Sequence, residues 1–396
     1  MVLALKRFSL KRVTTSLRLG ANYVPSAGWF YSWLDFSADA VRRDFADLAG
    51  LGLDHVRVFP IWPWIQPNRG LLRPVDDLLT TLDIAAEFGL EVAVDLLQGH
   101  LSSFDFLPSW VLTWHRRSVF TDRDVRDGIA AYAAYVSEAA ASRANVFAIT
   151  LGNEVNNLWP ANPATPEASR AWAAELVDVV REAAPGVAAL YSVYDDAWYA
   201  PDHPFHPADA VELGDLTTVH SWVFNGTSRI DGPLGPATLT HADYLVSLAA
   251  AAAPGRPVWL QEVGVPRPDV PAGNAAAFVR GTLAAVADNP ALWGVTWWSS
   301  HDIDRSLLDF PDREYDLGLF TTDHRRKPAA EALAEFAGTT RAAAARPTAV
   351  ACPVDLLTEP HRRAEVAPGS AFHLEWVRRR QEGPVMIEPA HVSARG

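Results

Sequence analysis

The chain has 396 residues, of which 49% are hydrophobic and 20% are charged, a composition typical of a globular protein with a large core. Its net charge of −13 argues against a nucleic-acid-binding surface, and its single cysteine, Cys352, excludes an intrachain disulfide framework. Fifteen tryptophans stand out, because flat aromatic rings suit both core packing and stacking against ligands. We expect neither a nucleic-acid nor a membrane partner, and the oligomeric state is left open.

The N-terminal residues are basic and contain no apolar stretch of signal-peptide length, since Lys6, Arg7, Lys11 and Arg12 interrupt it. We predict a poorly ordered extension over residues 1–16. Residues 245–253 are apolar but too short to span a membrane, and they fit a buried helix face. A cytoplasmic location is the simplest interpretation, with secretion by another route left open.

Strand-like and helix-like segments then alternate along the chain. The predicted strands are residues 17–23, 54–59, 91–97, 146–153, 188–193, 216–220, 258–262 and 292–298. The predicted helices are residues 38–49, 75–88, 125–141, 167–184, 241–252 and 275–287. Ser37 is a suitable N-cap for the first helix, and Gly50 and Gly89 follow predicted helix ends. The Pro- and His-rich interval 194–215 predicts only a short helix.

Eight mostly apolar strands alternating with helices predict an α/β fold with a parallel sheet buried on both faces. A (β/α)8 TIM barrel matches best in number and length, and we place it at residues 17–338. A doubly wound sheet is the alternative, but no predicted strand is followed by a Gly-rich phosphate-binding turn. For residues 339–396 we predict a loosely attached tail or small β appendage, with short strands around residues 371–377.

Two glutamates follow predicted strands at their carboxyl ends, where barrels of this kind assemble their active sites. The fourth strand ends in Asn153-Glu154 and the seventh in Glu262, so the fold brings together carboxylates that are 108 residues apart (262 − 154). Such a pair suits cleavage of a glycosidic bond, in which one carboxyl protonates the leaving oxygen and the other attacks the anomeric carbon. Arg57, in the second strand, is placed to keep one of them ionised.

These motifs carry a family resemblance. "GNE" at the fourth strand, "QEVG" at the seventh and "VRVF" on the second resemble clan A glycoside hydrolases, family 5 in particular, over roughly residues 19–336. The resemblance implies that Glu154 is the acid/base, that Glu262 is the nucleophile and that anomeric configuration is retained. The predicted substrate-binding residues are Arg57, His100, Asn153, Asn157, His220, Trp222, Trp297, Trp298, Trp62, Trp64 and Trp29.

The chain departs from the family pattern at two places. The family usually has His-x-Tyr at the sixth strand, with the tyrosine donating a hydrogen bond to the nucleophile, whereas this chain has His220-Ser221-Trp222. Indole can donate one hydrogen bond, so Trp222 or a tyrosine from elsewhere is expected to take that place. The family histidine after the third strand would fall near Leu97, and we expect His100 to line the pocket instead.

The tryptophans divide into two groups. Of the neighbours Trp297 and Trp298 only one can face the barrel mouth, because successive strand residues point to opposite faces, and we favour Trp297. The others lie in loops after the first three strands, where we predict stacking subsites for sugar rings. These are Trp29, Trp62, Trp64, Trp110 and Trp114.

We expect no metal and no cofactor, because the two-glutamate reaction needs neither. His203 and His206 in "DHPFHPAD" are interpreted as parts of a Pro-rich loop rather than as metal ligands. The stretch "GHLSSFDFLPSW" resembles bacterial branches of the family that include exo-acting β-mannosidases. We therefore predict a short β-mannoside cleaved from its end. The alternatives are an endo-acting β-mannanase or β-glucanase, a non-catalytic carbohydrate-binding barrel, and a metal-dependent barrel hydrolase or isomerase.

Overall fold

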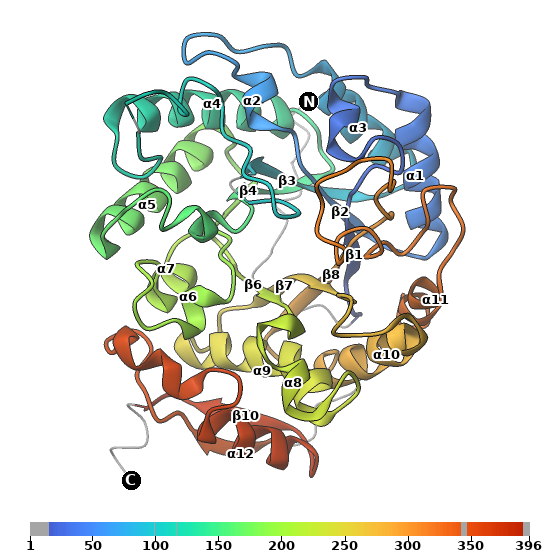
Figure 1. The fold of residues 1–396 in the computed structure, drawn as a ribbon, viewed down its shortest axis with the longest axis vertical. Coiled ribbons are helices and arrows are strands. Elements are labelled where there is room, and N and C mark those ends of the chain that lie inside the picture. The colour runs from blue at the N-terminus through green and yellow to red at the C-terminus, as the bar shows by residue number, and fades with distance from the viewer. Residues whose placement is uncertain (1–15, 99, 116, 342–346, 391–396) are drawn as a thin grey trace, which may run out of the picture.

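The computed structural model describes residues 16–98, 100–115, 117–341 and 347–390, so the predicted N-terminal extension lies outside the described residues except for Ser16. Eight parallel strands form the centre and helices surround them (Figure 1). The strands are β1 (Leu19–Asn22), β2 (His55–Val58), β3 (Glu91–Leu97), β4 (Val146–Gly152), β5 (Ala188–Leu190), β6 (Thr217–Ser221), β7 (Val258–Gly264) and β8 (Leu292–Trp298).

The sheet order β5-β4-β3-β2-β1-β8-β7-β6 closes into a barrel. A parallel bridge between Tyr191 and Thr217 joins the two outer strands, and the Thr218 hydroxyl donates to the Tyr191 carbonyl across the same seam at 2.9 Å. All strand pairs within the barrel are parallel. The predicted (β/α)8 barrel is therefore confirmed.

The six predicted helices are present as α1 (Ala38–Gly50), α3 (Asp76–Glu87), α4 (Arg123–Ala141), α5 (Pro166–Ala183), α9 (Pro236–Ala252) and α10 (Ala275–Val286). A further helix, α11 (Pro328–Ala334), is not among the predicted ones. Short helices lie in the loops: η1 (Trp29–Trp33), α2 (Trp62–Ile65), η2 (Val155–Leu158), α6 (Asp196–Tyr199), α7 (Pro207–Glu212), η3 (Val223–Asn225), α8 (Ser228–Asp231) and η4 (Ala272–Asn274). The Ser37 side chain caps α1 as predicted, accepting a hydrogen bond from the Ala40 amide. Among the described residues, no helix is long and apolar enough to cross a membrane.

Aromatic side chains fill the barrel interior at the amino ends of the strands. Phe147 of β4 lies 5.6 Å from Trp259 of β7 and 5.5 Å from Trp293 of β8, measured between ring centroids. The buried His55 ring packs among them, and a Cβ on the neighbouring Gly20 would lie 2.4 Å from it, so only glycine fits there. This packing closes the bottom of the barrel and leaves the carboxyl ends of the strands for a site.

The residues after α11 form a small unit beside α9, with strands β9 (Thr348–Ala351) and β10 (Val385–Glu388), η5 (Pro360–Val366) and α12 (Ala371–Arg380) (Figure 1). The predicted strands around residues 371–377 are wrong, because these residues belong to α12. Ser370 caps this helix, and His373, Trp376 and Val377 form a buried face at helical spacing. Trp376 packs edge-on against Tyr244 of α9.

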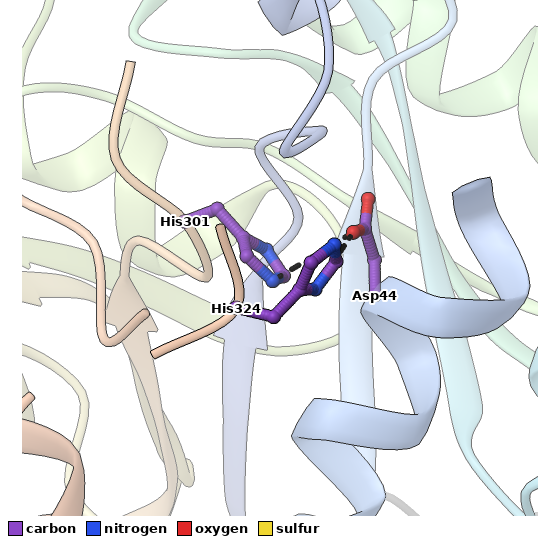
Figure 2. A group of neighbouring side chains, drawn as sticks. All are labelled: Asp44, His301 and His324. Carbon is purple, nitrogen blue, oxygen red and sulfur yellow. Dashed lines mark ion pairs between the residues drawn. The ribbon is translucent and has the colours of Figure 1, made fainter. Parts of the chain in front are cut away.

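The connection from β8 to α11, residues 299–327, runs over the barrel mouth before it returns to the helical layer. Pro311, Arg313, Glu314 and Leu317 of this connection line the pocket described below. The same connection also reaches α1, where His301 and His324 face Asp44 (Figure 2). One segment therefore links the pocket wall to the outer layer of helices.

Candidate active site

A pocket of about 640 Å³ lies at the carboxyl ends of the strands, and residues from the ends of β3 to β8 and the loops that follow them form its wall. Its volume is in the range of small-molecule sites, about 300–1,000 Å³. The lining residues are His100, Ser102, Ser103, Asn153, Glu154, Asn157, Trp159, Pro160, Tyr194, Asp196, His203, Trp222, Phe224, Glu262, Pro266, Trp298, Pro311, Arg313, Glu314 and Leu317.

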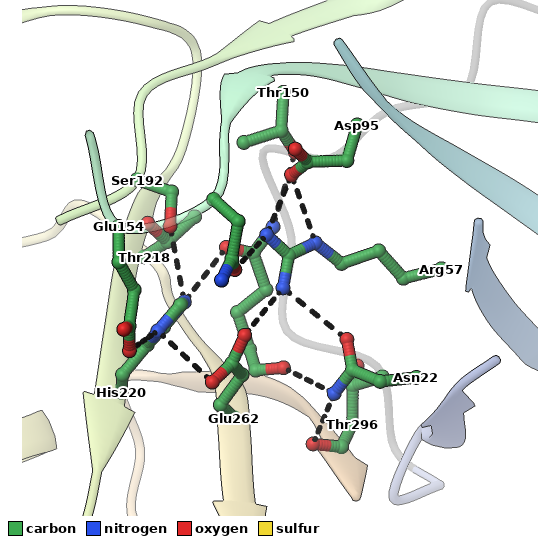
Figure 3. A network of polar contacts seen from close by, with 12 residues as sticks. Asn22, Arg57, Asp95, Thr150, Glu154, Ser192, Thr218, His220, Glu262 and Thr296 are labelled. Atoms are coloured by element: carbon green, nitrogen blue, oxygen red, sulfur yellow. Dashed lines mark hydrogen bonds and ion pairs between the residues drawn. The ribbon is translucent and has the colours of Figure 1, made fainter. Parts of the chain in front are cut away.

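Glu154 and Glu262 both line this pocket, as the strand-end argument predicts, and Figure 3 shows them on either side of His220. Glu154 directly follows β4, and Glu262 lies in β7 beside His220 of β6. One oxygen of each carboxyl lies within 4.8 Å of the other. The two carboxyls of retaining glycosidases lie about 5–5.5 Å apart, whereas those of inverting enzymes lie about 6.5–9.5 Å apart to admit a water, so oxygens this close favour the retaining arrangement.

Arg57 holds Glu262 from the barrel interior. Its Nη1 donates to Glu262 Oε1 at 2.8 Å and its Nη2 to Asn153 Oδ1 at 2.7 Å. The buried Asp95 accepts from both Nε and Nη2, and Asn22 accepts from Nη1, so the guanidinium is fixed on several sides (Figure 3). The structure thus places a fixed positive charge against one glutamate of the pair.

His220 bridges the two glutamates. Its Nδ1 lies 2.7 Å from Glu154 Oε1 and 3.3 Å from Glu262 Oε2, while its Nε2 contacts Ser192 Oγ at 3.0 Å (Figure 3). Burial lowers the pKa of His220 to about 4, so the imidazole is neutral at neutral pH. A neutral imidazole can donate or accept at Nδ1, so the contact with Glu154 survives in both protonation states of that carboxyl.

Burial also dominates the ionisation of the two carboxyls. It raises the pKa of Glu154 to about 7 and that of Glu262 to about 7, with His220 and Arg57 acting against this rise at Glu262. Two carboxyls this close titrate as a pair, which holds one proton near neutral pH. The ion pair with Arg57 favours the charge on Glu262 and leaves the proton to Glu154.

Asn157 holds the side chain of Glu154. Its Nδ2 donates to Glu154 Oε2 at 3.0 Å, and the preceding residue Asn153 is itself fixed by donating to the carbonyl of His100 at 2.7 Å. The backbone of Glu154 is left-handed, with φ of 44°, a conformation that costs a non-glycine residue about 1–2 kcal/mol. Strained backbone conformations are common at functional sites, and this one places the Glu154 carboxyl in the pocket wall.

Trp222 occupies the position of a hydrogen-bond donor to Glu262. Its Nε1 lies 3.4 Å from Glu262 Oε2, at the point where the family resemblance implies a tyrosine. His100 lies on the opposite part of the wall, and its Nδ1 contacts Asp105 at 3.1 Å. Burial lowers the pKa of His100, but the hydrogen bond with Asp105 and the charge that Glu154 carries when it is ionised outweigh burial and raise this pKa above its usual value.

The preference for Trp297 over Trp298 is wrong. Trp297 is fully buried in the core between the barrel and its helices, whereas Trp298 lines the pocket. Strand alternation explains the result, because Trp298 shares its face of β8 with Thr296, whose hydroxyl contacts His55 inside the barrel at 2.7 Å. Trp297 shares the opposite face with Val295, which belongs to the outer core.

The predicted subsites on the early loops are also not found, since none of the five loop tryptophans lines the pocket. Trp29 is buried against Phe310 and other aromatic rings, and Trp62 is buried with its Nε1 bonded to Gln66 at 2.8 Å. Trp64 packs against Tyr31 and Phe106. Loops of this length need an apolar core of their own, and these rings supply it. Trp110 contacts Trp62, and Trp114 is 94% exposed.

Several pocket residues are not among the predicted ones. Trp159 lies on the loop after β4, and its ring centroid is 4.9 Å from that of His203, a histidine of the Pro-rich "DHPFHPAD" segment. Glu314 supplies a further carboxyl, and burial raises its pKa to about 7. These positions lie in irregular loops, where no periodicity shows which side chains face the mouth. Tyr194, Asp196, Phe224 and Arg313 belong to the same group.

Comparison with protein-family models and with curated proteins gives no match. Comparison with solved structures gives matches over nearly the whole chain. A subfamily 18 enzyme of glycoside hydrolase family 5 from Streptomyces cattleya, in complex with GlcNAc, is 49% identical over 95% of this chain and 94% of that chain, with a TM-score of 0.90. A glutamate-to-alanine variant of one from Bifidobacterium longum subsp. longum ATCC 55813, in complex with Manβ1-4GlcNAc, is 39% identical over 96% and 92%, with a TM-score of 0.90.

A more distant match is an exo-β-1,4-mannosidase from Opitutaceae bacterium strain TAV5, which is 25% identical over 96% of this chain and 71% of that chain, with a TM-score of 0.78. The closed barrel with paired glutamates at its mouth defines an O-glycosyl hydrolase of clan A, a clan with a retaining mechanism. The chain belongs to glycoside hydrolase family 5, subfamily 18.

Proposed function

We propose that this enzyme is an exo-acting β-mannosidase that splits Manβ1-4GlcNAc and similar short β-mannosides into mannose and the remaining sugar. The observation that carries the proposal is the glutamate pair at the bottom of a pocket walled by residues from six strand ends and loops. An endo-acting enzyme needs a groove open at both ends. The subfamily 18 structures that hold GlcNAc or Manβ1-4GlcNAc support this choice of sugar.

In the first step Glu154 gives its proton to the glycosidic oxygen while Glu262 attacks the anomeric carbon. The bond from that carbon to the glycosidic oxygen breaks, the GlcNAc part leaves as a neutral alcohol, and mannose becomes covalently bound to Glu262. Arg57 and Trp222 hold the nucleophile ionised and oriented before the attack. The ionised Glu154 then keeps its contacts with His220 and Asn157.

In the second step Glu154 takes a proton from a water molecule, which attacks the same carbon and releases mannose from Glu262. Two displacements at one carbon retain the β configuration. Trp298 and Trp222 provide aromatic surface beside the two glutamates for the bound mannose. For the chain as a whole we propose a catalytic barrel over residues 17–338 and a C-terminal appendage over residues 339–396.

The test is a substrate panel with product analysis. We expect Manβ1-4GlcNAc and short β-1,4-mannosides to release single mannose units, with the β anomer appearing first. The matched β-glucosides should be cleaved at least about tenfold more slowly, a difference of about 1.4 kcal/mol in transition-state binding. Internal cleavage of polymeric mannan or glucan would contradict the proposal.

The roles of the two glutamates can be distinguished by comparing substrates with different leaving groups. Glu154→Gln should lose activity on Manβ1-4GlcNAc by more than about a hundredfold. It should keep much of its first-step rate on an aryl mannoside whose leaving group needs no proton. Glu262→Ala should lose activity on both substrates. Glu138→Gln, an exposed carboxyl of α4, is the matched control and should leave both activities unchanged.

A further inference from the structure

Two histidines and two aspartates converge outside the pocket, between α1 and the connection from β8 to α11. His301 Nε2 lies 3.3 Å from Asp47 Oδ2 and 3.7 Å from Asp44 Oδ1. His324 Nδ1 lies 2.7 Å from Asp47 Oδ2. It lies 3.9 Å from Asp44 Oδ1, and Figure 2 shows both histidines facing Asp44. Asp44, His301 and His324 therefore place one ligand atom each within 4.8 Å of the others, and Asp47 contacts both histidines.

Asp44 directs an unpaired oxygen into this cluster. The residue is completely buried, and its Oδ2 accepts hydrogen bonds from the Tyr23 hydroxyl at 2.8 Å and from the Ser26 amide at 3.1 Å. Its Oδ1 has no hydrogen-bond partner. No lysine or arginine among the described residues forms an ion pair with Asp44 or Asp47. A buried carboxylate oxygen without a hydrogen-bond partner is strongly unfavourable unless a cation binds to it.

The hydrogen bonds of His301 show which of its nitrogens is free. The Ser300 hydroxyl donates its proton to the Val24 carbonyl at 2.8 Å, so Ser300 Oγ accepts at its contact of 3.2 Å with His301 Nδ1. The proton of a neutral His301 is therefore on Nδ1. Its Nε2 lone pair then faces two carboxylate oxygens, an arrangement that repels unless a cation lies between them. Metal-bound histidines are oriented in the same way, by a hydrogen bond from the second ring nitrogen.

We propose that Asp44, His301 and His324 form a binding site for a divalent transition-metal ion of the Zn²⁺ type, with Asp47 as the carboxylate that contacts both histidines. Imidazole and carboxylate are ligands that such an ion prefers. A tetrahedral Zn²⁺ with bonds of about 2.1 Å holds neighbouring ligand atoms about 3.4 Å apart. The separations of Asp44 Oδ1 from His301 Nε2 and from His324 Nδ1, 3.7 Å and 3.9 Å, are within half an ångström of that value.

The ion reaches the site from solvent, because the side chains of His324 and Asp47 are 30% and 23% exposed. Its role is structural, since it joins α1 to the connection that carries Arg313, Glu314 and Leu317 to the pocket wall. The site is separate from the Glu154–His220–Glu262 group, which also has the composition of a metal site. The proposal does not depend on which sugar the enzyme cleaves.

The test is metal binding by the full-length protein after treatment with a chelator. Titration with ZnCl2, followed by calorimetry and by metal analysis after gel filtration, should give one tightly bound ion per chain and a raised Tm. His324→Asn should weaken binding by at least tenfold and remove the rise in Tm. Asparagine is chosen because it tolerates the left-handed backbone of His324, φ 64°, so the turn should persist. Asp47→Asn should act in the same direction.

Two controls locate the ion. His361→Asn, an exposed histidine outside the cluster, should leave binding unchanged, and Glu262→Gln should still bind one ion. Visible absorption of Co²⁺ in place of Zn²⁺ should report tetrahedral coordination in the unaltered protein and lose that signal in His324→Asn. The absence of tight binding would overturn the proposal. Binding that is lost in Glu262→Gln but kept in His324→Asn would overturn it as well.

Discussion

Arg57 contacts Glu262, with Nη1 2.8 Å from Oε1, and the structure records no hydrogen bond between Arg57 and Glu154 in the described residues. The hydrogen-bond partners of Glu154 are instead the neutral His220 and the amide of Asn157. Both carboxyls are buried, so burial alone does not separate their roles. The guanidinium breaks the symmetry, because it stabilises the ionised form of one glutamate more than that of the other.

Removal of this guanidinium should therefore act through Glu262. Arg57→Gln, made together with Asp95→Asn so that no buried carboxylate loses its partner, should lower kcat/KM by about a hundredfold or more. The loss of a nearby positive charge raises the pKa of Glu262, so the acidic limb of the pH profile should move to higher pH. The measurement is kcat/KM against pH, with Asp95→Asn alone as the control. An unchanged acidic limb would show that Arg57 does not set the charge of Glu262.

The raised pKa of Glu154 also links activity to stability. Folded Glu154 keeps its proton up to a pKa of about 7, whereas an unfolded glutamate loses it near pH 4.5. Between these values the folded state binds more protons, so its free energy of unfolding falls as pH rises. Glu154→Gln removes this loss, and it should raise Tm at pH 8 more than at pH 5. The gain corresponds to at most about 1.4 kcal/mol for each unit of pKa shift.

Thermal unfolding at the two pH values, with Glu138→Gln as a control on the surface of α4, measures this effect. An equal change in Tm at pH 5 and pH 8 would mean that the folded-state pKa of Glu154 is close to its ordinary value.

The barrel and the position of the glutamate pair follow from local patterns in the sequence. Each strand is a short apolar run bounded by turn residues, and the predicted strand ends agree with the structure within three residues. Because all strands are parallel, residues that end different strands must meet at one mouth. Glu154 and Glu262 needed no further information to be placed together.

The walls of the site depend on tertiary contacts that a local pattern does not contain. Trp29 and Trp62 are of the residue type expected of sugar platforms, yet they are buried against side chains of other segments, Trp29 against Phe310 and Trp62 against Tyr132 of α4. The choice between Trp297 and Trp298 depended on the face of β8 that points inward, and the contact of Thr296 with the buried His55 fixes that face. The helix α12 was missed because its apolar residues are few and its buried face appears only against Tyr244.

The corrected tryptophan positions predict different effects of two similar substitutions on substrate binding. Trp298→Ala removes a ring that lines the pocket and packs against Phe59, so KM should rise several-fold, up to about tenfold, and Tm should fall as well. Trp62→Ala leaves a cavity in a buried cluster and should lower the free energy of unfolding by about 3–5 kcal/mol, with KM and kcat nearly unchanged below Tm. A raised KM in Trp62→Ala would show instead that Trp62 contributes to substrate binding.

Trp222 allows a test of how the nucleophile is oriented in a chain that lacks the usual tyrosine. Its Nε1 donor lies 3.4 Å from Glu262 Oε2, and its ring stacks on Phe224 with centroids 5.3 Å apart. Trp222→Phe keeps an aromatic ring on the pocket wall and removes only the donor, so kcat should fall by about tenfold or more, since one hydrogen bond to a charged group contributes about 1.5–3 kcal/mol. The loss of a donor to the carboxylate also raises the pKa of Glu262, which should move the acidic limb upward. Phe224→Leu disturbs the stack without touching the donor, and it should change KM while leaving that limb in place.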